Sequence, residues 1–390
     1  MNTDIVVVGA GQAAAQFCLS LRAGGFRDRL LMIGAERYAP YQRPPLSKKF
    51  LTERRPPETL LLRAQSLWHD QGIELRIDTT VTTLDLKRHT LTTTGGQEVA
   101  YGTLVLATGT RARALKAPGA DLGGLFSLRA IDDVRRLRPA LDAARHIVIV
   151  GGGYIGLEVA AIMRGEERAV TVLEAEDRLL KRVTGADISA FFETLHRERG
   201  VDIRLGARLA ALTGEGTVTG VALADGTVLP ADCVLLAIGA QANDDLARAA
   251  GLACRDGIQV DTLARASVPD VYAIGDCTRF PSGRYGRELR LESVQNAIDQ
   301  AKAAAGSILG KPQPYDPVPW FWSDQYEIKL QMAGLSDGYD GAELVGDRVA
   351  PKFSVEYRSG GKLIAVDAVN DARAHMMSRR RIAEECVTPT

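Results

Sequence analysis

The sequence predicts an α/β protein with two Rossmann-like dinucleotide-binding domains and a small α+β domain at its C-terminus. The main observation is an internal repeat: DIVVVGAGQAAAQFCLSLRA from Asp4 is matched in character by HIVIVGGGYIGLEVAAIMRG from His146. Each copy contains a β-branched run, a glycine cluster, a helical pattern and a second strand, which together form a βαβ unit. Beyond Gly310 the chain becomes proline-rich and aromatic, which indicates a domain boundary.

The other elements follow from similar apolar runs. Runs 104–109 and 234–239 read as buried strands that return each segment to its own parallel sheet. Run 271–276 returns the chain to the first sheet, and a helical pattern follows over 293–309. The strands expected in the two repeats are 5–8, 30–33, 147–150 and 170–173. The last domain is expected to contain strands 352–357 and 362–369 and to close with a basic helix near 379–381.

Composition and charge exclude several classes of protein. The 390 residues carry 48 Lys and Arg against 48 Asp and Glu, so a general nucleic-acid or anionic-membrane binder is disfavoured. The five cysteines have no spacing typical of a disulfide framework, a zinc site or an iron–sulfur site. They are Cys18, Cys233, Cys254, Cys277 and Cys386. We therefore expect a reducing, cytoplasmic compartment and no bound metal.

Membrane and targeting segments are not expected either. The longest apolar run, residues 147–157, is broken by glycines and stops at Glu158, well short of a membrane helix. The N-terminus lacks the basic start of a signal peptide, so we expect the mature chain to begin at residue 1 or 2.

The first glycine motif is Gly9-x-Gly11-x-x-Ala14, placed between a strand and a helix. One small residue allows a tight turn, one lets a pyrophosphate reach the helix N-terminus, and one lets helix and strand pack closely. Glu36 ends the next strand, 27 residues after Gly9, where a carboxylate can bind ribose hydroxyls. The alternative is a purely structural glycine turn.

The second motif, Gly151-x-Gly153-x-x-Gly156, has all three glycines, and Glu174 follows 23 residues after Gly151. Two such sites indicate two bound dinucleotides. A chain of this kind is most simply a flavoprotein reductase, in which a nicotinamide passes hydride to a flavin. The alternative is a duplicated fold with one inactive site.

Lys48 and Glu158 are the candidate catalytic pair. Lys48 ends a Pro-Pro-Leu-Ser-Lys loop that leaves the first βαβ unit, and Glu158 lies just inside the second glycine-rich helix. We expect their charged atoms to lie within about 4 Å of each other, because a lysine held beside flavin N5 favours the reduced anion. The alternative is that each is a separate surface charge.

Four motifs together resemble one family: RPPLSK from Arg43, GGGYIGLE from Gly151, AIGDC from Ala273 and WFWSDQY from Trp320. The chain resembles the putidaredoxin-reductase-type, FAD-dependent NADH:ferredoxin reductases over nearly its whole length. This implies a glutathione-reductase-like flavoprotein that binds FAD and NADH. Hydride would pass from NADH to FAD, and two single electrons would then pass to a [2Fe-2S] ferredoxin that supplies a cytochrome P450 or a ring-hydroxylating dioxygenase.

The resemblance also implies domains and cofactor contacts. The FAD-binding domain would comprise residues 1–112 and 245–316, the NAD-binding domain 113–244, and the C-terminal α+β domain 317–390. The implied FAD contacts are Gly9, Gly11, Ala13, Ala14, Glu36, Arg43, Lys48, Val81, Gly109, Arg129, Asp276, Val294 and Trp322. The implied NAD contacts are Gly151, Gly153, Tyr154, Ile155, Gly156, Glu158, Glu174 and Gly239.

Partner and cofactor preference follow from local charge. Since ferredoxins of this type are acidic and the chain is neutral, we expect a basic docking patch of Lys302 and Lys329 near Trp322 on a monomer, although both lysines could be ordinary surface charges. We expect Glu174 to repel the 2′-phosphate of NADPH and so favour NADH. Three downstream basic residues could reduce this penalty if they turn toward the site: Arg178, Lys181 and Arg182.

Other functions stay open at this point. A flavin disulfide reductase or an NADH oxidase needs a redox cysteine at the flavin, and residues 38–51 contain none; only Cys277 lies near the expected flavin. A rubredoxin reductase would use the same units. An apoptosis-inducing-factor-like interaction module also stays open, because the absence of basic tracts and targeting segments counts only against a nuclear or DNA-binding role.

Overall fold

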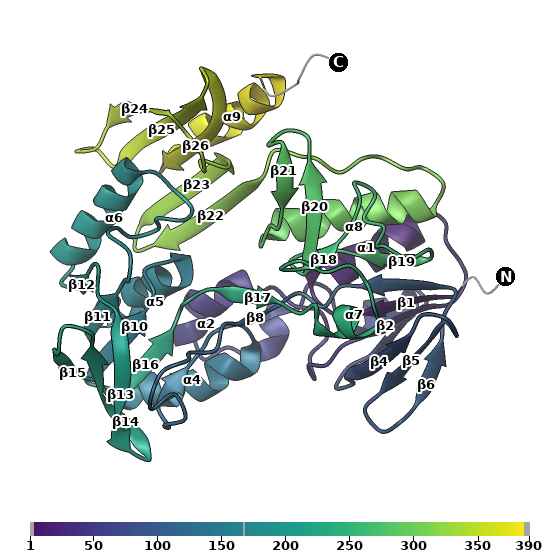
Figure 1. The fold of residues 1–390 in the computed structure, drawn as a ribbon, viewed down its shortest axis with the longest axis horizontal. Coiled ribbons are helices and arrows are strands. Elements are labelled where there is room, and N and C mark those ends of the chain that lie inside the picture. The colour runs from purple at the N-terminus through teal and green to yellow at the C-terminus, as the bar shows by residue number, and fades with distance from the viewer. Residues whose placement is uncertain (1–3, 167, 386–390) are drawn as a thin grey trace. The chain divides into compact units, whose positions relative to one another are not determined.

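The computed structural model describes residues 4–166 and 168–385 and forms two compact units, each built on a five-stranded parallel sheet (Figure 1). The first unit contains residues 4–42, Pro57–Arg111 and Gln241–Pro319. The second contains Arg43–Pro56, Ala112–Ala240 and residues from Trp320 onward. The α/β class and its two Rossmann-like sheets are thus confirmed.

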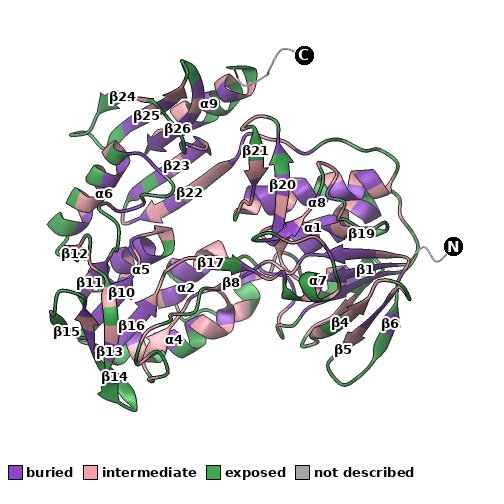
Figure 2. Ribbon diagram, viewed as in Figure 1, coloured by how far each residue is buried: buried purple, intermediate pink, exposed green. Residues whose placement is uncertain are grey.

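The sheet of the first unit has the order β19-β7-β1-β2-β3, and all its neighbouring strands are parallel. Its strands are β1 (Ile5–Val8), β2 (Leu30–Ile33), β3 (Ile73–Arg76), β7 (Thr103–Leu106) and β19 (Val271–Ala273). The pairing of β7 with β1 and of β19 with β7 confirms the two expected returns of the chain to this sheet. Of the three inner strands, β1 and β2 are buried along their whole length and β7 is buried from Leu104 onward, as expected for the centre of a parallel sheet (Figure 2).

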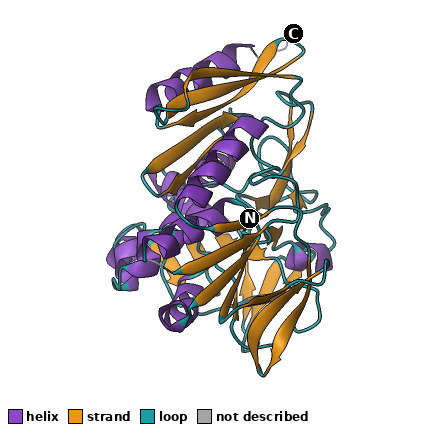
Figure 3. Ribbon diagram, turned by 90° about the vertical axis from the view of Figure 1, so that its left-hand side faces the viewer, coloured by secondary structure: helices purple, strands orange, loops and turns teal. Residues whose placement is uncertain are grey.

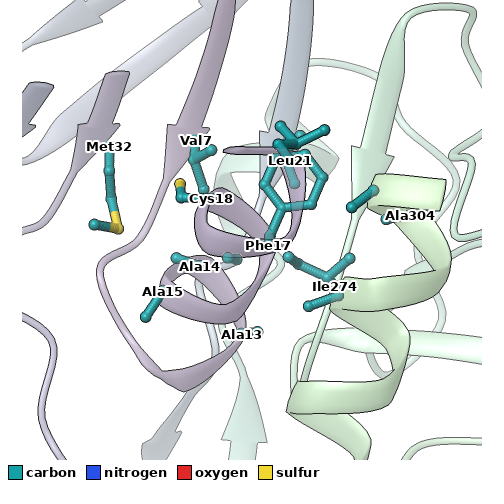
Figure 4. Packing of buried hydrophobic residues seen from close by; sticks show 14 of the residues in the cluster. Val7, Ala13, Ala14, Ala15, Phe17, Cys18, Leu21, Met32, Ile274 and Ala304 are labelled. Atoms are coloured by element: carbon teal, nitrogen blue, oxygen red, sulfur yellow. The ribbon is translucent and has the colours of Figure 1, made fainter. Parts of the chain in front are cut away.

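Two long helices build the core of the first unit: α1 (Gln12–Ala23) and α8 (Val294–Ile308). Both present rows of alanines, which let the helices approach closely, and Phe17 and Leu21 fill the space toward the sheet. Figure 4 shows Ala14 and Phe17 of α1 with Ala304 of α8 and Ile274 in this cluster. Ser293 caps α8 through a hydrogen bond to the backbone N–H of Asn296, so this helix begins where the sequence predicts.

Smaller elements complete the first unit. An antiparallel meander of β4 (Val81–Asp85), β5 (Thr90–Thr93) and β6 (Glu98–Ala100) was not predicted. A second small sheet contains β18 (Ile258–Gln259), β20 (Thr278–Ser282) and β21 (Arg287–Leu289). The short helices are η2 (Pro57–Leu60), α3 (Gln65–Asp70) and α7 (Asp245–Ala249). The short strands β8 (Thr110–Ala112) and β17 (Ala240–Ala242) lie where the chain passes between the residues of the two units.

The sheet of the second unit has the order β12-β11-β10-β16-β9 and is also parallel throughout. Its strands are β9 (Leu125–Phe126), β10 (His146–Val150), β11 (Ala169–Leu173), β12 (Asp202–Arg204) and β16 (Cys233–Leu236). Its helices are α4 (Ile131–Ala143), α5 (Tyr154–Gly165) and α6 (Ala186–Glu198). An antiparallel meander follows, made of β13 (Leu209–Glu215), β14 (Thr217–Leu223) and β15 (Val228–Pro230).

The C-terminal part of the second unit is an antiparallel sheet in the order β22-β23-β26-β25-β24, with one helix beside it (Figure 3). Its strands are β22 (Trp320–Gln325), β23 (Ile328–Gly334), β24 (Gly341–Asp347), β25 (Lys352–Ser359) and β26 (Lys362–Val369). The helix is α9 (Ala372–Glu385), which packs on β23 and β26. The segment η1 (Pro44–Ser47) and α2 (Lys49–Thr52) packs on α5 and α4 of the same unit.

Candidate functional site

The first glycine turn gives each of its three small residues a different task. Gly9 has φ +114°, and a Cβ there would lie 2.1 Å from the carbonyl oxygen of Ala107, so only glycine fits. Gly11 is the N-cap of α1, has no side-chain cap, and has nothing within 4 Å of its Cβ position. Ala14 is fully buried. The open space over uncapped N–H groups fits a pyrophosphate at this helix end.

The second turn repeats this geometry. Gly151 has φ +112°, and a Cβ there would lie 2.4 Å from the carbonyl oxygen of Ala237. Gly153 is the uncapped N-cap of α5 and also faces open space. A Cβ on Gly156 would lie 2.2 Å from the carbonyl oxygen of Gly151, which closes the third position to any larger residue. Both helix ends therefore fit a dinucleotide.

The two predicted ribose-binding carboxylates follow the second strand of each unit. Glu36 accepts a 2.6 Å hydrogen bond from the Tyr41 hydroxyl. Glu174 accepts from the backbone N–H of Gly152 at 2.8 Å and of Glu176 at 2.9 Å. These bonds hold Glu174 against the glycine turn, and a carboxylate with two oxygens retains lone pairs for a ligand.

Of the three basic residues after Glu174, two are engaged elsewhere. Arg178 donates to the carbonyl oxygens of Thr184 and Lys181 and to the Ser189 hydroxyl. Lys181 forms ion pairs with Glu176 at 2.9 Å and Asp177 at 3.1 Å. The Arg182 guanidinium instead lies 3.3 Å from the Cβ position of Gly239.

The ion pair between Lys48 and Glu158 is the most distinctive feature of the second unit. Lys48 Nζ lies 2.8 Å from Glu158 Oε1, which confirms the predicted separation. Glu158 is only 4% exposed and Lys48 is 20% exposed. Two hydroxyls also donate to Glu158, from Ser47 at 2.5 Å and from Ser323 at 2.7 Å. Two segments distant in sequence, residues 47–48 and β22, thus meet at one carboxylate of α5.

Hydrogen bonds continue from this carboxylate along buried side chains. Gln325 Nε2 lies 3.2 Å from Ser323 Oγ, and Gln325 Oε1 lies 2.8 Å from His196 Nε2. His196 Nδ1 lies 3.2 Å from the Tyr326 hydroxyl. Burial lowers the pKa of His196 to about 4, so its imidazole is neutral near pH 7.

The first turn of α5 carries the two other predicted NAD contacts. The Tyr154 ring stacks at 4.9 Å on Phe321, and its hydroxyl lies 2.7 Å from Met332 Sδ. Burial raises the pKa of Tyr154 well above its usual range, so the phenol stays protonated. The neighbouring Ile155 is 41% exposed, an unusual state for an isoleucine at the start of a buried helix.

The predicted FAD contacts divide between the two units. Nine lie in the first unit: Gly9, Gly11, Ala13, Ala14, Glu36, Val81, Gly109, Asp276 and Val294. The other four lie in the second: Arg43, Lys48, Arg129 and Trp322. In the first unit, a Cβ on Gly275 (φ +82°) would lie 3.0 Å from Ala13 Cβ, which brings the residue before Asp276 against the first turn of α1. In the second unit, Arg43 donates to the Arg129 carbonyl oxygen at 2.8 Å.

The predicted docking lysines each have an acidic neighbour. Lys302 Nζ lies 3.7 Å from Asp299, and Lys329 Nζ lies 4.0 Å from Asp324. Both lysines are more than half exposed, so these pairs are weak. Trp322 is half-buried and its ring lies 5.8 Å from that of Trp320.

The cysteines that the structure describes are poor redox groups. Burial raises the pKa of the Cys18 and Cys233 thiols to about 12, and it also raises the pKa of Cys254 and Cys277. Cys386 lies outside the described residues. Across residues 4–166 and 168–385, no three His, Cys, Asp or Glu side chains gather as a metal site, and no helix has the length and hydropathy to cross a bilayer.

Sequence reasoning missed Ser47, Ser323, Gln325 and His196. Ser47 and Ser323 lie inside motifs that carry the family resemblance, yet neither was assigned a role. The alternation of Ser323 and Gln325 along β22 was a signal for two of them, because residues two apart in a strand point to the same face. Both side chains are fully buried. Buried polar side chains require partners, so this alternation points to a polar network.

Two family models match the chain. A model described as pyridine nucleotide-disulphide oxidoreductase matches residues 3–301, and one described as reductase C-terminal matches residues 320–389.

Among curated relatives, the ferredoxin reductase subunit of a 5,5′-dehydrodivanillate O-demethylase from Sphingobium sp. is 43% identical, covering 98% of this chain and 93% of that protein. Putidaredoxin reductase of Pseudomonas putida is 42% identical, covering 95% and 89%. The crystal structure of a covalent putidaredoxin reductase–putidaredoxin complex matches with a TM-score of 0.95 at 40% identity, covering 98% and 94% of the two chains.

These matches extend over both units and the C-terminal sheet, and they agree with the two dinucleotide turns described above. Proteins of this family use FAD and NAD(P)H. The chain belongs to the pyridine nucleotide-disulphide oxidoreductase family, as an FAD-dependent oxidoreductase of the putidaredoxin-reductase-type ferredoxin reductases, which confirms the predicted resemblance.

Proposed function

We propose that this protein transfers electrons from NADH through FAD to a [2Fe-2S] ferredoxin, which supplies a cytochrome P450 or a ring-hydroxylating dioxygenase. The observation that carries the proposal is the Lys48–Glu158 pair, placed one turn from the second glycine turn and linked to the C-terminal sheet through Ser323. A structural ion pair would gain little from such an arrangement, since burying charge is costly. A pair that stabilises charge on a bound cofactor offsets the free energy lost in burying it.

The chain's own residues supply binding and orientation. The uncapped N-terminus of α1, with Glu36 nearby along the chain, would hold the FAD pyrophosphate and adenosine ribose. The uncapped N-terminus of α5 and Glu174 would hold NADH in the same manner. When bound, FAD accepts a hydride and releases electrons one at a time.

Lys48 would act as a fixed positive charge at the site of hydride transfer. Glu158 holds the ammonium in place at 2.8 Å, and the hydroxyls of Ser47 and Ser323 share the negative charge of the carboxylate. An oriented cation stabilises developing negative charge without reorganisation during the reaction. We assign the Lys48–Glu158 pair as the catalytic pair on this ground.

The competing functions lose support for a chemical reason. Disulfide and peroxide reduction need a reactive thiolate, and the four described cysteines have raised pKa values.

For the same chain we propose an FAD-binding domain of residues 1–112 and 245–316, an NAD-binding domain of residues 113–244 and a C-terminal domain of residues 317–390. We further propose a cytoplasmic monomer.

The docking surface for ferredoxin belongs to the proposal as well. Lys302, Lys329 and Trp322 would form it, with the two lysines steering an acidic partner. Their weak pairs at 3.7 and 4.0 Å leave both ammonium groups available to a partner's carboxylates.

The test is Lys48→Ala in the FAD-loaded protein. The wild-type protein should be yellow, lose its colour within seconds of NADH addition, and regain it when an oxidised [2Fe-2S] ferredoxin is added without air. Lys48→Ala should slow this colour loss at least tenfold and weaken FAD binding by less than twofold. The proposal fails if NADH reduces Lys48→Ala at the wild-type rate, or if the reduced wild-type protein does not pass electrons to any ferredoxin.

A further inference from the structure

A continuous chain of hydrogen bonds leads from Glu158 to the turn between β22 and β23. Its members are Ser323 and Gln325 on β22, His196 on α6, and Tyr326 in the hairpin turn. The side chains of Ser323, Gln325 and His196 are fully buried. No water can supply a missing partner along this path without opening the packing, so each donor must meet an acceptor.

The charge of Glu158 fixes the direction of the first bonds. A carboxylate in an ion pair with Lys48 accepts hydrogen bonds, so Ser323 uses its single hydrogen to donate to Oε1. Ser323 Oγ must then accept from its other neighbour, Gln325. The amide nitrogen of Gln325 therefore faces Ser323, and its oxygen faces His196.

The same reasoning fixes the tautomer of His196. The oxygen of Gln325 can only accept, so the proton of the neutral imidazole lies on Nε2, 2.8 Å away. Nδ1 is then an acceptor and takes the hydrogen of the Tyr326 hydroxyl at 3.2 Å. All four donors along the chain point toward Glu158.

The end of the chain is held in an unusual backbone conformation. Tyr326 has φ +55°, a left-handed conformation that is costly for an aromatic residue. Its ring packs 5.1 Å from that of His196 and lies under the Arg199 guanidinium, also at 5.1 Å. The contacts with His196 and Arg199 thus fix the position of the Tyr326 ring and of its hydroxyl.

We propose that Ser323, Gln325 and His196 are positioning residues for hydride transfer, which hold the Glu158 carboxylate in place through a one-directional hydrogen-bond chain that starts at Tyr326. Aligned donors polarise one another and concentrate positive potential on the carboxylate. Ser323, Gln325 and His196 therefore act on the reaction through Glu158. This inference rests on the proposed role of the Lys48–Glu158 pair.

The first test is the tautomer of His196, which needs no activity measurement. The chain has five histidines, so nitrogen-15 NMR of the imidazole groups, assigned with His196→Gln, can resolve this ring in the purified wild-type protein. We expect a neutral ring with its proton on Nε2 from pH 6 to pH 9. A proton on Nδ1, or a charged ring at pH 6, would overturn the proposal.

The second test is the rate of flavin reduction by NADH in single-turnover experiments. Ser323→Ala removes the last donor and should lower the limiting rate about tenfold, since the lost bond is to a charged group. NADH affinity and FAD content should change by less than twofold. The matched control is Ser378→Ala, because Ser378 is equally buried but donates to the His375 carbonyl oxygen on α9.

Tyr326→Phe is the mildest variant, since it removes one hydroxyl from a half-buried ring. We expect a two- to fourfold lower limiting rate and a shift of the His196 Nδ1 resonance. Wild-type rates for both Tyr326→Phe and Ser323→Ala, together with a slow Lys48→Ala, would refute the chain while the proposed function stands. A wild-type rate for Lys48→Ala would instead refute the proposed function.

Discussion

The two βαβ units use one turn geometry and then diverge at the next helical turn. The glycines of both turns have positive φ at the first position and open space at the second. Five residues after the second glycine, α1 carries Gln16 and α5 carries Glu158. Gln16 bonds only within its own helix, to Ser20 Oγ at 3.0 Å, whereas Glu158 meets Lys48, Ser47 and Ser323 from other segments.

In the proposed function, the features that the two units share bind a cofactor, and the feature that differs acts in hydride transfer. The shared part of the two units, the turn and the uncapped helix end, is what a pyrophosphate requires. The part that differs decides what each helix packs against: α1 packs on α8 through small apolar residues, and α5 packs on β22 through a charged group. If the proposed function holds, the second unit differs from the first by a single buried carboxylate and the partners that hold it.

The largest expected effect is that of Glu158→Gln. The change leaves Lys48 with a neutral partner, and breaking a buried pair costs about 3 kcal/mol or more. Because Lys48 keeps some contact with water, we expect flavin reduction by NADH to slow about a hundredfold. The corresponding change in the first unit, Gln16→Ala, should leave the rate within twofold. Equal effects of the two substitutions would show that the units do not differ in this way.

The third position of each turn offers a second comparison. Gly156→Ala would force a Cβ to within 2.2 Å of a carbonyl oxygen, so we expect a loss of about 2 kcal/mol in the free energy of unfolding. Ala14→Gly adds no atoms and should cost about 1 kcal/mol through helix propensity alone. Urea unfolding of both variants measures these losses. A Gly156→Ala protein as stable as the wild type would mean that α5 can move away from β10 at little cost.

Substitution of Glu36 should affect FAD binding, and substitution of Glu174 should affect the preference between NADH and NADPH. Glu174→Ser removes the charge that opposes a 2′-phosphate, so the ratio of kcat/KM for NADH over NADPH should fall about tenfold. Arg182, which lies beside Gly239, is the basic residue placed to assist NADPH in that variant. Glu36→Ser should lower FAD affinity and leave the ratio unchanged. The assignment of sites would be reversed if Glu36→Ser changed the ratio and Glu174→Ser did not.

The smallest effect concerns the two lysines of the docking surface. Lys302 lies on α8 beside the helix of the first turn, and Lys329 lies on β23 beside the strand that contacts α5. Exchange of either lysine for glutamate should raise the KM for ferredoxin about threefold at low salt and reduce its salt dependence. NADH-driven reduction of ferricyanide is the control and should not change. Equal losses with ferricyanide would place the lysines in support of the flavin site.

The buried parallel strands could be predicted closely from the sequence. β1, β2 and β26 have the expected limits, because each is a short apolar run that borders a glycine at one end. The meander β4–β6 could not be predicted in this way. Its first two strands, VTTLD and TLTT, are rich in threonine, and none of the residues of β4 is fully buried, so their pairing depends on tertiary context.

The candidate site was predictable only where chemistry is local in sequence. The glycine turns and the acidic residues after them follow from spacing within one βαβ unit. The Lys48–Glu158 pair needed the family resemblance to raise it above two ordinary surface charges. Ser323, Gln325 and His196 escaped because their roles depend on how β22 and α6 meet, and no spacing along the chain encodes that contact.

The four described cysteines have a practical consequence for the protein's durability. A reduced flavin that meets oxygen produces peroxide, which attacks thiolates far faster than thiols. Burial raises the pKa of the Cys18 and Cys233 thiols to about 12, so both stay protonated at pH 7. Over the described part of the chain, the buried thiols should therefore resist oxidation by this by-product.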